Sequence, residues 1–189
     1  MDDLLLLLRK AGIGCHVRSV FVGAIMFADD LALLAPSRSA VQEMMSICEE
    51  YCSEYCLLFN TGKTKAMIFG PQWDKIHPSP LLLNRQPVEY VVRWKYLGCL
   101  ITAGKNLLFS NTNDLRAFRC SANSIVTSLK RPSEHVLMML LYSFSIPILT
   151  YACEVKFFSS SEMLDCHIAV NDSIRRIFSF HRWESIRHL

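Results

Sequence analysis

Short apolar runs separated by polar turns dominate the first hundred residues of the chain. Runs of this length, rich in β-branched and aromatic residues, favour strands over helices. The pattern predicts a strand hairpin over 20–26 and 31–35, and a second hairpin over 81–83 and 88–92 around a turn at 84–87. Further strands are predicted at 57–59, 66–69 and 94–101, and residues 71–80, with three prolines, form an exposed loop.

Helical periodicity accounts for the remaining segments. Residues 2–10 form a helix that ends at Gly12-Ile13-Gly14, and Pro36 to Ser39 opens the next one. Ser39 is the expected N-cap of that helix, with Gln42 closing a capping box. Its apolar positions recur with the helical period, at 41, 44, 45, 48, 51, 52 and 55. After residue 112 the pattern predicts three helices, at 113–129, 134–151 and 161–180, with Pro147 breaking or redirecting the second.

Three of the eight cysteines repeat every fourth residue. Cys48, Cys52 and Cys56 would share one face of the helix that follows Ser39. The favoured interpretation is a buried core face, and a metal site is the alternative. No Cys-x-x-Cys pair supports zinc.

Composition places the chain among proteins that bury much of their surface. It has 189 residues, a hydrophobic fraction of 51% and a mean hydropathy of +0.24. The length fits one domain or one and a half. Residues 1–70 hold 6 Lys and Arg against 8 Asp and Glu, whereas residues 71–189 hold 14 against 9. An acidic half could bind metal ions and a basic half could bind nucleic acid. An asymmetry of this size also arises often by chance.

The longest uncharged segment, 136–153, is at the lower limit of a membrane span. It contains Ser143, Ser145, Pro147 and Thr150, so we expect a buried helix and no membrane partner. No secretory signal is evident, since acids rather than bases precede the short apolar run at 4–8. The expected location is intracellular, either nuclear or cytoplasmic, with reduced thiols.

The adjacent acids Asp29 and Asp30 are the main candidate for chemistry. They fall at the tight turn of the first predicted hairpin, between two apolar strands. A carboxylate pair at the end of strands that run into a core is costly unless a cation or hydrogen bonds hold it. Hard divalent ions such as Mg²⁺ take carboxylate oxygens, and polymerases use such ions in pairs. The alternative is that Asp29 and Asp30 only form a turn, which is a common role for Asp.

Five short motifs follow one another in the order seen in one family. They are Gly12-Ile13-Gly14-Cys15-His16, Phe27 to Pro36, Ile47-Cys48-Glu49-Glu50-Tyr51, Phe59-Asn60 with Lys63-Thr64-Lys65, and Lys95-Tyr96-Leu97-Gly98. The string resembles non-LTR (LINE-type) retrotransposon reverse transcriptases, whose catalytic hairpin carries an aromatic-x-Asp-Asp signature. The resemblance implies an α+β fold, with the second half of a polymerase palm at 1–104 and a helical thumb-like region at 105–189.

The resemblance also assigns roles to residues of the hairpin and of the strand that follows. Asp29 would be a metal ligand and Asp30 its supporting neighbour, with Mg²⁺ or Mn²⁺ as the cofactor of the intact parent enzyme. Lys63 would protonate or neutralise the leaving pyrophosphate, with Lys65 as the alternate choice. A solvated lysine at the end of a strand is the simpler alternative for Lys63.

Further positions would contact an RNA template and a DNA primer. Lys95, Tyr96 and Gly98 resemble the primer-grip turn, where a glycine admits the primer backbone; Tyr96 could equally be a core residue. The C-terminal stretch holds Arg175, Arg176, Arg182 and Arg187, interleaved with Phe178, Phe180 and Trp183. Arginines among aromatic residues suit phosphate contact and base stacking, although an amphipathic helix with a solvated basic face is an equal alternative. The chain departs from the family at Lys156, where an aromatic residue is usual.

The family's first palm aspartate and its fingers have no counterpart at matching positions of this sequence. We therefore expect the chain to be inactive alone, and to need the earlier part of the palm or another chain to cover its apolar surface. Two alternatives stay open. One is a non-catalytic remnant that binds nucleic acid or a partner; the other is a decayed reading frame that does not fold stably.

Overall fold

The computed structural model describes residues 2–76 and 78–187 and has an α+β fold, as predicted. The chain divides into two compact units. The first unit is the chain up to Trp94 together with Ala103–Asn106, and the second unit is Lys95–Thr102 together with the chain from Leu107 onward. The division into a partial palm at 1–104 and a thumb-like region at 105–189 stays a prediction.

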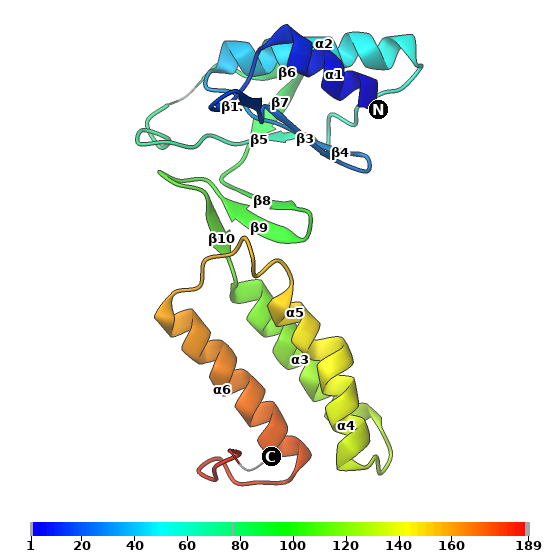
Figure 1. Ribbon diagram of the computed structural model, residues 1–189, viewed down its shortest axis with the longest axis vertical. Coiled ribbons are helices and arrows are strands. Elements are labelled where there is room, and N and C mark those ends of the chain that lie inside the picture. The colour runs from blue at the N-terminus through cyan, green and yellow to red at the C-terminus, as the bar shows by residue number, and fades with distance from the viewer. Residues whose placement is uncertain (1, 77, 188–189) are drawn as a thin grey trace. The chain divides into compact units, whose positions relative to one another are not determined.

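The first unit combines two helices with short strands (Figure 1). Three small sheets form: β1 with β2, β3 with β4, and a mixed sheet in which β7 pairs antiparallel with β6 and parallel with β5. The elements are α1 (Asp2–Ala11), β1 (His16–Val17), β2 (Val20–Phe21), β3 (Ala24–Phe27), β4 (Asp30–Leu33), α2 (Arg38–Glu54), β5 (Lys65–Ala66), β6 (Leu81–Leu83) and β7 (Gln86–Tyr90).

The second unit is mainly helical, with a small sheet in the order β10-β9-β8. Strand β8 (Arg93–Tyr96) starts in the first unit and ends in the second. The other elements are β9 (Cys99–Thr102), β10 (Leu108–Ser110), α3 (Thr112–Ser128), α4 (Glu134–Leu140), a π-helical segment (Leu141–Ser145), α5 (Ile146–Thr150) and α6 (Ser160–Ile177). Phe118 of α3, Leu141 and Ile177 are buried together in its core.

The core of the first unit joins α1, α2 and the β3–β4 hairpin. Leu4 and Leu8 are one helical turn apart on α1 and are fully buried against Met44 and Cys48 of α2. Four partly buried side chains of the hairpin pack on this cluster: Ala24, Met26, Leu31 and Leu33. This packing is what attaches the candidate hairpin to the rest of the unit.

The predicted start of α2 is wrong by two residues. Ser37, not Ser39, is the N-cap: its backbone is extended, and its side chain accepts a hydrogen bond from the Ala40 N–H. Gln42 closes no capping box, because its amide is used elsewhere. It donates to the Leu82 carbonyl and accepts from the Leu82 N–H, both at 2.8 Å, and so pairs with β6.

Four of the strand predictions are also corrected. The strand predicted at 20–26 is divided into β2, which pairs with β1, and β3, which pairs with β4. Residues 57–59 are not a strand, and of the run predicted at 66–69 only Ala66 is in a strand, the two-residue β5. The single strand predicted at 94–101 is a hairpin, β8–β9, that turns at Leu97 and Gly98. Both turn residues have positive φ, +44° and +80°, which is typical of a tight two-residue turn.

The helix predicted at 134–151 is confirmed, but its burial is one-sided. Leu137, Leu141 and Ser145 are buried, whereas Tyr142 and Phe144 are exposed. Pro147 does not end the helix, because it lies in the first turn of α5, where the missing N–H is tolerated, and the π-helical segment precedes it. No helix within residues 2–76 and 78–187 is both apolar and long enough to span a bilayer.

The cysteine face of α2 is confirmed for two of its three members. Cys48 and Cys52 are buried in the core of the first unit. Cys56 lies beyond the end of the helix, with a φ of +54°, and is exposed. Burial raises the pKa of the Cys48 thiol to about 12 and also raises the pKa of Cys52.

Thiol alkylation tests this core. At about pH 8 only about one Cys48 in ten thousand is a thiolate, because its pKa is near 12. We expect iodoacetamide to modify the exposed Cys56 rapidly in the folded chain and to leave Cys48 and Cys52 unmodified until denaturant is added. Peptide mass spectrometry reads out each site. Equal labelling of Cys48 and Cys56 without denaturant would contradict the packing of α1 on α2.

Candidate active-site hairpin

The β3–β4 hairpin has a two-residue turn formed by Ala28 and Asp29. Phe27 pairs with Asp30 across the antiparallel ladder, so Asp30 is the first residue of β4. Ala28 has a φ of +54°, in the left-handed region that L-residues seldom adopt. Strain of this kind costs about 1–3 kcal/mol and persists only where the surrounding strands enforce it.

The opposite end of the hairpin is fixed by the segment around Gly14. The Cys15 N–H donates to the Leu34 carbonyl at 2.9 Å, the Val22 N–H donates to the Cys15 carbonyl at 2.9 Å, and the Leu34 N–H donates to the Gly23 carbonyl at 2.7 Å. A side chain on Gly23 would lie 3.0 Å from the Gly14 Cα and closer still to the Phe21 ring. The close approach of these glycines lets the chain clamp the hairpin base.

The two faces of the hairpin differ sharply in burial. Ala24 and Met26 face the core, whereas Ile25 is 48% exposed and Phe27 is 65% exposed. This alternation is the period of a strand with one buried face. The turn that carries the acids therefore projects from an element that is anchored at its base and along one face.

Both acids are exposed, which corrects the expectation of a carboxylate pair that is costly unless a cation or hydrogen bonds hold it. They lie at the tip, past the last core contacts, so water solvates them and no cation is required for folding. Within residues 2–76 and 78–187, neither carboxylate takes part in an ion pair or in a group of three His, Cys, Asp or Glu side chains. Their oxygens are thus available to a ligand.

The two lysines of the Asn60 turn differ in availability. The Lys63 N–H donates to the Asn60 side chain at 3.1 Å, and the Lys63 side chain is exposed. Lys65, in contrast, donates to Glu89 at 2.8 Å, and its ammonium lies 5.7 Å from the Trp94 ring centroid. Phe59, just before this turn, packs on the same core as the hairpin. Among the described residues, the Lys63 ammonium thus has no ion-pair partner, whereas Lys65 is paired with Glu89 of β7.

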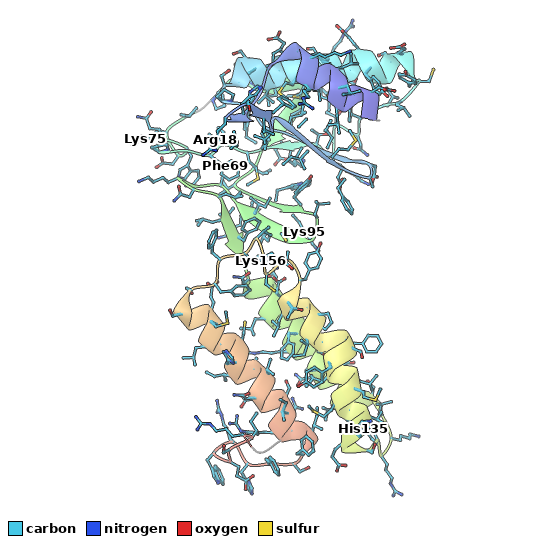
Figure 2. The ribbon with its side chains drawn as sticks, in the orientation of Figure 1. Arg18, Phe69, Lys75, Lys95, His135 and Lys156 are labelled. Carbon is cyan, nitrogen blue, oxygen red and sulfur yellow. The ribbon has the colours of Figure 1, made fainter. Side chains whose placement is uncertain are left out.

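The β8–β9 turn is supported by Tyr151, a residue that the sequence analysis assigned no role. The Tyr151 hydroxyl donates to the Leu97 carbonyl at 2.7 Å. A Cβ on Gly98 would lie 2.8 Å from the Tyr151 ring, so only glycine fits beneath it. Lys95 lies on β8 (Figure 2) and is exposed, whereas Tyr96 is half-buried. Spacing along the chain gives no signal for a contact between residues 54 positions apart.

The structure gives Lys156 a defined set of partners at a position where the resemblance predicts an aromatic residue. Its ammonium is buried, donates to Asp114 at 2.6 Å, and lies 5.7 Å from the Tyr151 ring centroid. Figure 2 shows Lys156 in the connection between α5 and α6. A buried charge needs such a partner. Asp114, in the first turn of α3, gives no sequence signal for this ion pair, because an acid is favourable in the first turn of any helix.

Arg175 and Arg176 are both engaged in contacts within the second unit. Arg175 donates to Asp172 at 3.0 Å and to the Glu184 carbonyl at 3.0 Å. Arg176 donates to the Asn123 side chain of α3. These arginines, predicted to bind nucleic acid, hold the end of α6 to its neighbours. Lys95, Tyr96, Gly98, Arg175 and Arg176 all belong to the second unit, and Asp29, Asp30, Lys63 and Lys65 belong to the first.

Two curated proteins show distant similarity to the chain. The Pol polyprotein of the type-1 retrotransposable element R1 of Bradysia coprophila, described as retrovirus-related, is 30% identical over 112 residues, which is 56% of this chain and 10% of the polyprotein. An uncharacterized transposon-derived protein of Caenorhabditis elegans is 28% identical over 144 residues, which is 72% of this chain and 50% of that protein.

The chain thus spans half of one relative and a tenth of the other. No family model matches it, and no solved structure matches it. The similarity supports an origin in a transposable element.

Substitution at Gly98 tests the supported turn. Gly98→Ala should lower the free energy of unfolding by about 1–3 kcal/mol, because alanine disfavours a φ of +80° and its Cβ would meet the Tyr151 ring. Tyr151→Phe should cost about 1 kcal/mol through the lost hydrogen bond to Leu97. Urea denaturation followed by circular dichroism measures both.

Gly62→Ala is the matched control, since Gly62 has an ordinary φ and a Cβ there would lie 3.4 Å from the Asn60 side chain, an ordinary contact distance. Equal stability of the Gly98 and Gly62 variants would show that Tyr151 does not pack on this turn.

Proposed function

We propose that this chain is part of a LINE-type RNA-directed DNA polymerase and carries the catalytic hairpin of its palm. One observation carries the proposal: a core-anchored hairpin presents Asp29 and Asp30 to solvent at a two-residue turn, directly after an exposed aromatic residue, Phe27. The similarity to transposon-derived proteins supports the same origin. The region after the hairpin would supply further palm strands and thumb-like helices.

The donor set at the turn fits a hard divalent cation. Mg²⁺ is commonly bound by one or two carboxylates, with the remaining positions filled by water and substrate phosphates. Asp29 and Asp30 offer such oxygens without competing protein partners among the described residues. Asp29, at the tip, is the proposed ligand, and Asp30, on the first rung of the ladder, is its supporting neighbour.

When bound, Mg²⁺ or Mn²⁺ would activate the primer hydroxyl and stabilise charge on the transferred phosphate. The strained turn at Ala28 would hold the Asp29 carboxylate at a fixed point beyond the core. Lys63, whose side chain is exposed, would neutralise or protonate the departing pyrophosphate. Lys65 is the weaker candidate for this role, because Glu89 already pairs with its ammonium.

The proposed substrates are an RNA template, a DNA primer and deoxynucleoside triphosphates. The β8–β9 turn would contact the primer, since its backbone at Leu97 and Gly98 is tight and Lys95 is exposed beside it. Tyr151 would position this turn rather than touch the primer, because its hydroxyl is used by the Leu97 carbonyl.

The outer surfaces of the first unit support the expectation that the chain works against further protein. Leu6 and Leu7 of α1 are 51% and 43% exposed, and Phe27 is 65% exposed. Strands β3 and β4 pair only with each other among the described residues, so both outer edges are open. The proposed neighbour is the earlier part of a palm, which would bring the remaining metal ligand. The chain by itself is then proposed to be inactive, as in a non-catalytic remnant.

A hairpin graft tests the catalytic proposal. Residues 20–35 would replace the catalytic hairpin of a LINE-type reverse transcriptase that is active on an RNA template. We expect the graft to retain Mg²⁺-dependent primer extension, because the hairpin would place Asp29 at the metal site. Asp29→Ala in the graft should lower the rate by about a thousandfold, equivalent to about 4 kcal/mol.

Two controls make the graft decisive. The first is a thermal melt, which reports whether the graft folds. Arg18 and Ser19 lie outside the grafted range, so the host enzyme supplies its own connection to the hairpin. Asp29→Asn keeps the shape of the side chain and removes its charge, and it should be as inactive as Asp29→Ala. A folded graft that extends no primer with Asp29 intact would refute the proposal.

A further inference from the structure

The segment after α6 places an exposed tryptophan on a basic turn. Trp183 is 81% exposed, which is unusual for the largest apolar side chain. The His181 ring stacks on it, with ring centroids 4.7 Å apart and planes inclined by 3°. One face of the indole is therefore covered by a parallel ring, and the high exposure leaves the rest of the indole to solvent.

The turn is held in this shape by its own hydrogen bonds. The His181 N–H donates to the Glu184 carboxylate at 2.7 Å, and the Glu184 N–H donates to the His181 carbonyl at 3.0 Å. Arg175 of α6 donates to the Glu184 carbonyl at 3.0 Å, which ties the turn to the helix. The stacked rings are thus held in place before any ligand arrives, and less entropy is lost on binding.

Two arginines lie within four residues of Trp183 along the chain. Arg182 and Arg187 are exposed, and neither guanidinium has an ion-pair partner among residues 2–76 and 78–187. Glu184, the acid within this turn, is occupied by the His181 N–H. The turn thus carries two exposed guanidinium groups that lack an ion-pair partner among the described residues, beside one carboxylate that already accepts a hydrogen bond.

We propose that His181, Arg182, Trp183 and Arg187 form a binding site for single-stranded nucleic acid. A base would stack on the free face of Trp183, and the guanidinium groups would contact the flanking phosphates. A duplex would bind less well, because its bases are already stacked on one another. An apolar protein partner is disfavoured by the free arginines. The site needs neither a metal ion nor Asp29, so it goes beyond the proposed polymerase chemistry.

This assignment moves the nucleic-acid contact away from Arg175 and Arg176. Arg175 braces the turn through Glu184, and Arg176 holds α6 to Asn123 of α3. In this account both are positioning residues, and the contact with the ligand lies with side chains five or more positions further along the chain.

Fluorescence anisotropy tests the site. The full chain is titrated, in the presence of EDTA, into a labelled oligothymidylate of about 20 nucleotides. We expect Trp183→Ala to weaken binding by about tenfold and Trp183→Phe to weaken it less, because a phenyl ring still stacks. Arg182→Gln and Arg187→Gln should each lower the slope of log affinity against log salt by about one.

Phe157→Ala is the matched control, since Phe157 is an equally exposed aromatic residue in the same unit at 86%. It should leave binding unchanged, and binding should persist in EDTA, which separates this site from the proposed metal-dependent active site. Equal losses from Trp183→Ala and Phe157→Ala, or equal affinity for a duplex of the same length, would overturn the proposal.

Discussion

One-sided burial of the β3–β4 hairpin is the constraint on which the candidate site depends. Ala24, Met26, Leu31 and Leu33 pack against α1 and α2, and the segment around Gly14 clamps the base. Only the tip escapes these contacts, and the two acids lie there. An isolated two-stranded hairpin is marginal in water, so the helices supply the stability that the ladder lacks. The core therefore decides where the carboxylates are held.

In the second unit, a series of polar contacts holds the β8–β9 turn in place. Asp114 pairs with the buried Lys156, whose ammonium lies near the Tyr151 ring, and the Tyr151 hydroxyl holds the Leu97 carbonyl. A buried ion pair seldom adds net stability, but breaking one is costly. Its value here is specificity: it fixes the α5–α6 connection so that Tyr151 can reach the β8–β9 turn. A lysine in place of the usual aromatic residue is thus accommodated by a complete local network.

The local sequence pattern was enough to predict the helices and the Asp29–Asp30 hairpin, because apolar periodicity and turn propensity depend on residues that are close together in the sequence. The local pattern failed where contacts between residues far apart in the sequence determine the structure. Gln42 looked like a capping-box residue, yet β6 takes its amide. Leu97 and Gly98 looked like the interior of a strand, yet Tyr151 supports a turn there. Arg175 and Arg176 looked free, yet their partners lie on a turn and on another helix.

The exposure of the acids was missed for a related reason. Apolar flanks on both sides of Asp29 implied a buried pair, but the number of rungs before the turn sets how far the tip stands from the core. Sequence alone does not give that distance.

The most direct test of the central claim is an amide NMR titration of the chain with Mn²⁺, whose unpaired electrons broaden nearby signals. The account predicts that the amides of Ala28, Asp29 and Asp30 broaden first, and that Asp29→Asn removes the effect. Earlier broadening at another acidic position, such as Glu49 and Glu50 of α2, or uniform broadening across the chain, would contradict a cation site at the hairpin tip.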